Sequence, residues 1–128
     1  LNSVTSDVKL DSGAYKNLGS MKNATPEQFD RIVGLHNIHT NEGLAANNNL
    51  PEKHIRKFVG SPHSIIRMKI AKHPKLSEYN MKRLANDENQ FVRSRIAARK
   101  DLPDHLINKL KDDPYQNVRS AVWETHKR

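Results

Sequence analysis

Apolar residues return at fixed positions along this chain, and the step between those positions is constant. The stretch Asp87–Ile96 (DENQFVRSRI) occurs again as Asp113–Val122 (DPYQNVRSAV), which sets a 26-residue period. A looser copy lies one period earlier, at Ser61–Ile70 (SPHSIIRMKI). Agreement in many positions at one period predicts a repeat protein. The apolar columns, meaning positions one period apart, include Leu50, Leu76 and Leu102; Phe58, Leu84 and Leu110; and Ile70, Ile96 and Val122.

Each 26-residue unit is predicted to hold two short helices. The first helix opens with Pro or Ser followed by an acid, and a carboxylate in the first turn complements the helix dipole. Its buried stripe has i, i+3 spacing, whereas the second helix has i, i+4 spacing. Gly, Ser, Asn, Asp and Pro between them mark the turns. The predicted buried pairs are Ile55/Phe58, Met81/Leu84 and Ile107/Leu110 in first helices, and Ile66/Ile70, Val92/Ile96 and Val118/Val122 in second helices.

An earlier, degenerate unit is predicted before these three. Thr25-Pro26-Glu27 combines an N-cap residue, a first-turn proline and an acid, which together favour a helix N-terminus. Its apolar stripe is Phe29, Ile32 and Val33, and Gly34 falls at its end. Thr40-Asn41 stands where later units have an apolar residue followed by Arg. Terminal repeats are often atypical because they cap the stack.

These patterns predict an all-α fold of about four two-helix units within residues 21–128. The units are placed at about residues 19–44, 45–70, 71–96 and 97–122, followed by a C-terminal cap at 123–128. Trp123 shares a column with Ala71 and Ala97 and is interpreted as the cap over the end of the stack. Residues 1–20 lack a helical period and are predicted to be a tail. Because Gly19-Ser20-Met21 resembles a cloning junction, this tail is either native or a tag.

The repeated motif resembles the leucine-rich repeat variant and, more broadly, HEAT-like repeats. The matching residues in one unit are Val92-Arg93, Ile96-Ala97, Leu102-Pro103, Leu110 and Asp113. The resemblance covers residues 45–122 well and residues 21–44 weakly. It implies a right-handed α-solenoid with a concave inner face. The 26-residue unit is slightly longer than the usual variant repeat, and without cysteine no iron–sulfur role carries over.

The resemblance also implies a ladder of Asp and Arg side chains along the stack. In this chain the ladder residues are Asp87, Arg93, Asp113 and Arg119. Ser61 stands where the first aspartate is expected, so Arg67 is predicted to lack its carboxylate. An Arg fork suits a carboxylate or a phosphate equally well. Arg67 is therefore open to either role.

Composition and charge limit the possible functions. Hydrophobic content of 35% is thin for one compact core but suits a stack of small units. Residues 1–50 hold four Lys or Arg against five acids, whereas residues 51–128 hold 18 against nine. A basic surface suits nucleic acid or an acidic protein. No apolar run approaches the roughly 18–20 residues of a membrane span and no signal peptide is visible, so we expect a cytoplasmic, monomeric protein.

The predicted binding residues are bases on or just after the second helices. Arg95 and Arg99 are i, i+4 and are expected to share a helix face. If second helices line the concave face, as the resemblance implies, these bases form a strip that follows a phosphate backbone. The alternative is a solvated face. The strip comprises Lys69, Lys72, Arg95, Arg99 and Lys100, with Arg67 beside it; the first-helix bases Lys53, Arg56, Lys57, Lys82, Arg83, Lys109 and Lys111 are assigned to a solvated face.

The sequence shows no catalytic constellation, so we expect a protein that is not an enzyme and has no small-molecule substrate. His36 and His39 lack a third ligand at a suitable position, and we expect no metal and no cofactor. Aromatics make up only 5% of the chain, which disfavours base-specific reading. Two hypotheses remain: binding of a nucleic-acid backbone, and a scaffold for an acidic protein or peptide.

Overall fold

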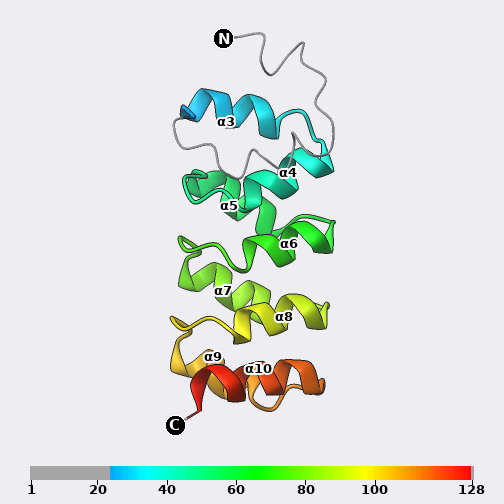
Figure 1. Cartoon of the computed structure of the whole chain (residues 1–128), viewed down its shortest axis with the longest axis vertical. Coiled ribbons are helices and arrows are strands. Elements are labelled where there is room, and N and C mark those ends of the chain that lie inside the picture. Colours follow the sequence, from blue (N-terminus) through cyan, green and yellow to red (C-terminus); the bar gives the residue numbers. More distant parts are fainter. Residues whose placement is uncertain (1–23, 128) are drawn as a thin grey trace.

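The computed structural model describes residues 24–127, and all regular structure in that range is helical. The all-α prediction is confirmed. The helices stack in chain order along the long axis of the molecule (Figure 1). The predicted tail at residues 1–20 lies outside the described residues. The helices are α3 (Pro26–Val33), α4 (Ile38–Ala45), α5 (Glu52–Val59), α6 (Ser64–Ile70), α7 (Glu78–Ala85), α8 (Gln90–Ala97), α9 (Asp104–Leu110) and α10 (Gln116–His126).

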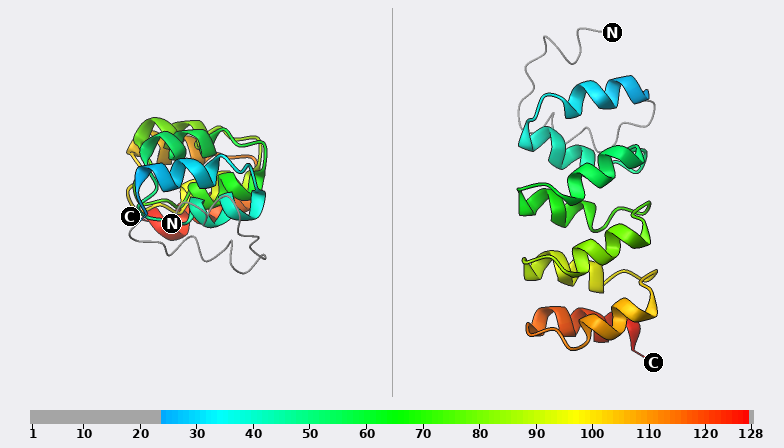
Figure 2. Two further views of the ribbon diagram at one scale, coloured as in Figure 1. Left: turned by 90° about the horizontal axis from the view of Figure 1, so that it is seen from above. Right: turned by 180° about the vertical axis from the view of Figure 1, so that it is seen from behind.

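The helices alternate between two layers, which Figure 2 shows from above and from behind. Helix α7 contacts both α5 and α9, whereas α6 contacts both α4 and α8, and α8 contacts α10. We call the layer of α5, α7 and α9 the first-helix layer. The layer of α4, α6, α8 and α10 is the second-helix layer. Side chains that are one period apart therefore lie on successive helices of one layer.

Local capping explains where the helices begin. Thr25 and Gln28 form a reciprocal capping box at α3: the Thr25 hydroxyl accepts from Gln28 N–H at 3.1 Å, and Gln28 Oε1 accepts from Thr25 N–H at 2.8 Å. Asn89 caps α8 by accepting from Phe91 and Val92 N–H. Asn37 and Ser77 play the same part at α4 and α7. Helices α5 and α9 follow Pro51 and Pro103, which fix the entering chain.

A continuous apolar core runs between the layers from Phe29 to Val122. The predicted buried pairs lie in it, with one exception. Ile107 is partly buried and packs against this core. The residue before it, Leu106, is buried, as are Asn80 and His54 one and two periods earlier. The expectation for Ile107 is therefore met only in part.

The C-terminal end of the stack is formed by α10. Trp123 on this helix is 63% exposed, whereas Ala71 and Ala97 in the same column are fully buried. The buried alanines are small where the next unit packs closely against them. The role of Trp123 as a cap stays a prediction.

Candidate binding surfaces

Two ladder rungs join successive units, the second unit to the third and the third to the fourth. Arg67 Nε donates to Asp87 Oδ2 at 2.8 Å, and its Nη2 donates to Oδ1 at 3.3 Å. Arg93 makes the same bidentate contact with Asp113, at 2.7 and 3.1 Å. All four side chains are largely buried. Each rung thus holds an ion pair between residues 20 apart in the sequence.

The expectation that Arg67 lacks a carboxylate was wrong. Its partner belongs to the following unit, and Ser61 supplies only its backbone carbonyl, at 2.6 Å from Arg67 Nη1. Arg93 and Arg119 bind the carbonyls of Asp87 and Asp113 in the same way. Arg67 therefore has no free fork for an external anion. Arg119 is exposed and has no carboxylate partner within residues 24–127.

The carboxylate of Asp113 also shapes its own turn. Its Oδ1 accepts from Tyr115 N–H at 2.9 Å, as Asp87 Oδ1 accepts from Asn89 N–H. Burial alone would raise the pKa of Asp113, but the hydrogen bonds from Arg93 and Tyr115 N–H, with the charge of Arg93, bring it below its ordinary value. Arg93 also lies over the Tyr115 ring, 5.5 Å from its centroid. These rungs are structural and leave no group for a ligand.

A second polar column links the units through their backbones. It consists of Asn47, His73 and Arg99, which are all buried. His73 Nε2 donates to the carbonyl of Asn47 at 2.7 Å. Arg99 Nη1 donates to the carbonyls of Ala71 and His73 at 2.7 and 2.8 Å. Each member after the first thus satisfies a carbonyl of the preceding unit.

Arg99 was predicted to belong to the binding strip; it lines the same hollow as Lys72, Arg95 and Lys100, but its guanidinium is already bonded within the protein. Helix α8 ends at Ala97, so Arg99 does not continue the face of Arg95. Its guanidinium instead turns into the stack and is gripped by Asp101 at 2.9 Å on both oxygens. These hydrogen bonds lower the pKa of Asp101. Arg99 thus stabilises the contact between its own unit and the preceding one.

The buried imidazole of His73 is held in its neutral form. Nε2 must carry the proton because it donates to a carbonyl, and Nδ1 accepts from Lys75 N–H at 3.0 Å. Burial is the largest influence and lowers the pKa of His73. The hydrogen bond to the Asn47 carbonyl opposes it in part, and the charges of Lys75 and Arg99 lower the pKa further. Protonation would place a second N–H against the Lys75 amide. The fold therefore disfavours the imidazolium.

This arrangement predicts a loss of stability in mild acid. The unfolded chain binds a proton at His73 near pH 6.5 while the folded chain does not, so stability falls as pH drops below about 6.5. We expect the His73→Asn variant to show a weaker pH dependence between about pH 7 and 5. Urea unfolding of both proteins at a series of pH values measures this. An identical pH slope in the variant would contradict the assignment.

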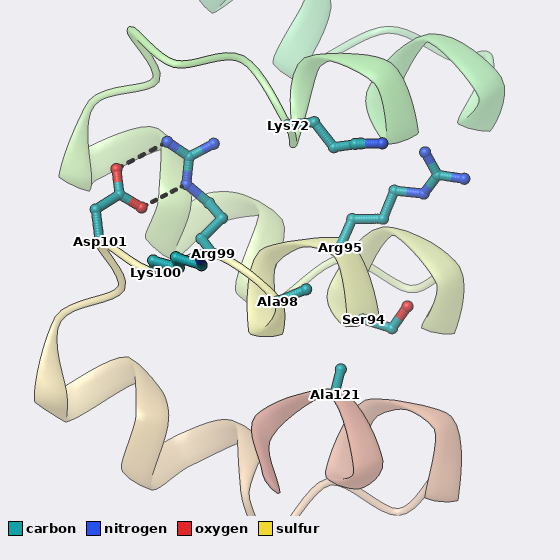
Figure 3. A pocket seen from close by; sticks show the side chains of 8 residues that line it. All are labelled: Lys72, Ser94, Arg95, Ala98, Arg99, Lys100, Asp101 and Ala121. Atoms are coloured by element: carbon teal, nitrogen blue, oxygen red, sulfur yellow. Dashed lines mark hydrogen bonds and ion pairs between the residues drawn. The ribbon is translucent and has the colours of Figure 1, made fainter. Parts of the chain in front are cut away.

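The remaining predicted binding residues lie on the second-helix layer. Lys72, Arg95 and Lys100 line one open hollow of about 550 Å³ (Figure 3). The other residues of its lining are Ser94, Ala98, Ala121 and the bonded pair Arg99 and Asp101. A second hollow of about 210 Å³ shares Lys72 and Arg95 with it. Figure 3 shows Lys72 and Arg95 reaching toward each other, while Arg99 turns away to Asp101. We call Lys72, Arg95 and Lys100 the second-helix cations.

Two features weaken the second-helix cations as an anion site. Lys69, predicted to belong to them, lies 3.7 Å from Glu42. Arg95 and Lys72 also lie at the C-terminal ends of α8 and α6, where the helix dipole is negative and offsets part of their charge. Three cations therefore remain of the six that were predicted.

The first-helix layer carries a more regular set of cations, which had been assigned to a solvated face. Lys57, Arg83 and Lys109 occupy one column on α5, α7 and α9, and all three are exposed. Arg56 and Lys82 form the neighbouring column. None of these five has an ion-pair partner within residues 24–127. The signal is visible in the sequence, since Arg31 begins the same column as Lys57, Arg83 and Lys109.

Comparison with known proteins gives no information on function, so the proposals below rest on the residues of this chain. No family model, curated protein or solved structure matches this chain. Within the described residues, no three His, Cys, Asp or Glu side chains are grouped to hold a metal ion. None of the described helices combines the length and apolarity needed to cross a membrane.

Proposed function

We propose that this chain is a HEAT-like α-solenoid of about four 26-residue repeats that binds the phosphate backbone of nucleic acid without catalysing a reaction. The observation that carries the proposal is the first-helix row, which we define as Lys57, Arg83 and Lys109. One cation recurs at the same position on α5, α7 and α9, the three helices of the first-helix layer. Arg56 and Lys82 stand beside the row on α5 and α7.

The spacing of the row suits a polyanion. Packed helices lie about 8–10 Å apart, so three successive helices place their cations along roughly 20 Å. Each strand of duplex DNA carries one charge per about 3.4 Å of helix axis. The row can therefore lie beside several phosphates at once. Contacts of Lys and Arg to phosphates position a protein without reading sequence.

The same face favours a duplex over a single strand. Single-strand binding normally uses several aromatic platforms. Among the described residues the exposed aromatic on this face is Tyr79, one turn before Lys82 and Arg83 on α7. Its hydroxyl suits a phosphate or sugar contact. We therefore propose a duplex with little sequence preference.

A second candidate function, binding of an acidic peptide, is favoured by the second-helix layer. There the cations flank apolar surface: Phe91 is 53% exposed and stands one turn before Arg95 on α8. Ala98 and Ala121 line the adjoining hollow. Arg and aromatic side chains beside an apolar hollow are typical anchors for a protein partner.

The test compares two charge-reversal variants that change the net charge equally. Lys57→Glu/Arg83→Glu alters the first-helix row, and Lys72→Glu/Arg95→Glu alters the second-helix cations. Binding of the full chain to a labelled random-sequence duplex is measured by anisotropy over a range of salt. We expect the first-helix variant to lose at least about tenfold in affinity and about two units of salt slope, and the matched variant to lose less.

Each other outcome rejects part of the proposal. No binding of the parent chain at low salt rejects the nucleic-acid function. Equal losses in both variants show that only net charge matters and reject the row as the site. A loss confined to the second-helix variant moves the site to that layer, where an acidic amphipathic peptide is the next probe.

A further inference from the structure

One rung of the ladder is missing, between the first two units. Asn41 occupies the position that Arg67 and Arg93 hold in later units, and Ser61 occupies the position of Asp87. Neither residue can form the ion pair of a rung. At this boundary the structure has an open hollow of about 280 Å³. Asn41, Lys57, Ser61 and His63 are among the residues that line it. The hollow thus occupies the place where an ion pair stands in later units.

The same place two units later shows what has changed. An equivalent hollow there is lined by Lys109, Arg93 and three carboxylates, those of Asp87, Asp112 and Asp113. In the first hollow, Gly60 and Ser61 replace the last two of these carboxylates, and the lining contains no acid. Lys57 keeps the position of Lys109. Lys57 therefore has no carboxylate in the lining of its hollow, whereas three carboxylates line the hollow of Lys109.

The polar groups of the first hollow are poorly satisfied by the protein. Asn41 Oδ1 is buried and has no hydrogen-bond partner among the described residues, which is costly for a polar atom. The NH₂ group at the other end of the same amide is a hydrogen-bond donor. Ser61 Oγ accepts from His63 N–H at 3.1 Å, which leaves its own O–H as a donor. His36, also in the lining, has the left-handed φ of 53°.

A further cation stands at the edge of the hollow. A Cβ atom added to Gly60 would lie 3.4 Å from Arg83 Nη2, so this guanidinium rests against the turn. Lys57 and Arg83 therefore lie beside a turn that lacks the two carboxylates of the later unit. Hydroxyl and amide donors together with a lysine form the kind of environment that an oxyanion requires.

We propose that this hollow binds a small oxyanion, a phosphate or carboxylate group, in place of the missing aspartate. Lys57 supplies the charge, and the Ser61 hydroxyl and the Asn41 amide donate hydrogen bonds. The site does not depend on duplex binding, although it shares Lys57 with the first-helix row. The group can come from a free anion or from a phosphate of a bound polymer, and the test separates the two.

The test rebuilds the missing rung. The Asn41→Arg/Ser61→Asp variant leaves the net charge unchanged and fills the hollow with an internal ion pair. Inorganic phosphate is the probe, with sodium chloride keeping ionic strength constant. Thermal unfolding of the full chain should show a saturable rise in Tm, of about 5 °C at a phosphate concentration ten times Kd. Amide resonances of Ser61 and His63 should shift along the same curve, and both responses should vanish in the variant.

Further measurements keep the outcome decisive. Ser61→Ala removes one donor without adding charge, and we expect several-fold weaker phosphate binding if the rebuilt variant does not fold. Equal responses of parent and variants, or no saturable shift in the millimolar range, overturn the proposal. Duplex binding is measured on the same proteins. If the Asn41→Arg/Ser61→Asp variant loses duplex binding, the oxyanion is a phosphate of the polymer. If this variant keeps duplex binding, the oxyanion is a free anion.

The two proposals can fail separately. A phosphate response without duplex binding rejects the nucleic-acid function alone. Duplex binding without a phosphate response rejects the oxyanion site alone.

Discussion

Replacing Arg93 by alanine is expected to lower the free energy of unfolding by about 3–5 kcal/mol. Arg93 forms a bidentate pair with Asp113, and only 11% and 6% of the two side chains are exposed. Its removal leaves the buried Asp113 carboxylate without its ion-pair partner. The backbone carbonyl of Asp87 also loses its donor. Chemical denaturation followed by circular dichroism measures the change.

Arg119→Ala is the matched control for this prediction. Arg119 occupies the same column and binds the equivalent carbonyl, that of Asp113, but it is exposed. We expect a loss of about 1 kcal/mol or less. If the Arg93 and Arg119 variants lose equal stability, the backbone contact rather than the ion pair carries the energy of the rung.

The Arg99→Ala variant is expected to lose about 2–4 kcal/mol, because two buried carbonyls lose their donor. Arg99 spans from its own unit to the carbonyls of Ala71 and His73. Arg99→Lys should restore little of the loss, since an ammonium cannot reproduce the planar fork that also holds Asp101.

Arg95→Ala provides the comparison on the same layer. Arg95 is partly exposed and lines the open hollow, so we expect a change within about 0.5 kcal/mol. Denaturation of the three variants gives the result. A stability loss for Arg95→Ala as large as that for Arg99→Ala would show that the exposed base, too, is structural.

Much of the local structure could be predicted from the sequence because the same positions are buried every 26 residues. A helix that must cover its neighbour in the same way in every unit requires an apolar residue at the same position. Phe58, Leu84 and Leu110 are one such column. Capping residues act over three or four positions, so Thr25 could be recognised as the start of α3 without knowledge of the rest of the fold.

The ladder could not be assigned in full because its partners are far apart in the chain. Asp87 and Arg93 are close in sequence and were expected to belong together, yet Arg93 takes only the backbone carbonyl of Asp87. The carboxylate instead receives Arg67 from the preceding unit. Only the packing of one unit on the next decides between these partners.

The second polar column could not be predicted, for a different reason. Asn47, His73 and Arg99 differ in size and charge, and a search for similar residues passes over them. What His73 and Arg99 share is a bond to a carbonyl of the preceding unit. The helix end at Ala97 was equally invisible, since the next residues have no breaker before Asp101.

The direction of the rungs has a consequence for how such a chain can change its length. A unit gives its aspartate to the unit before it and its arginine to the unit after it. Loss of one whole 26-residue unit from the middle would bring Arg67 opposite Asp113, and gain of one would add a complete rung. Duplication or deletion of whole 26-residue units therefore conserves the ion pairs, whereas a change that is not a multiple of 26 residues leaves a buried charge without its partner. The change of length that these ion pairs tolerate best is the gain or loss of a whole 26-residue unit.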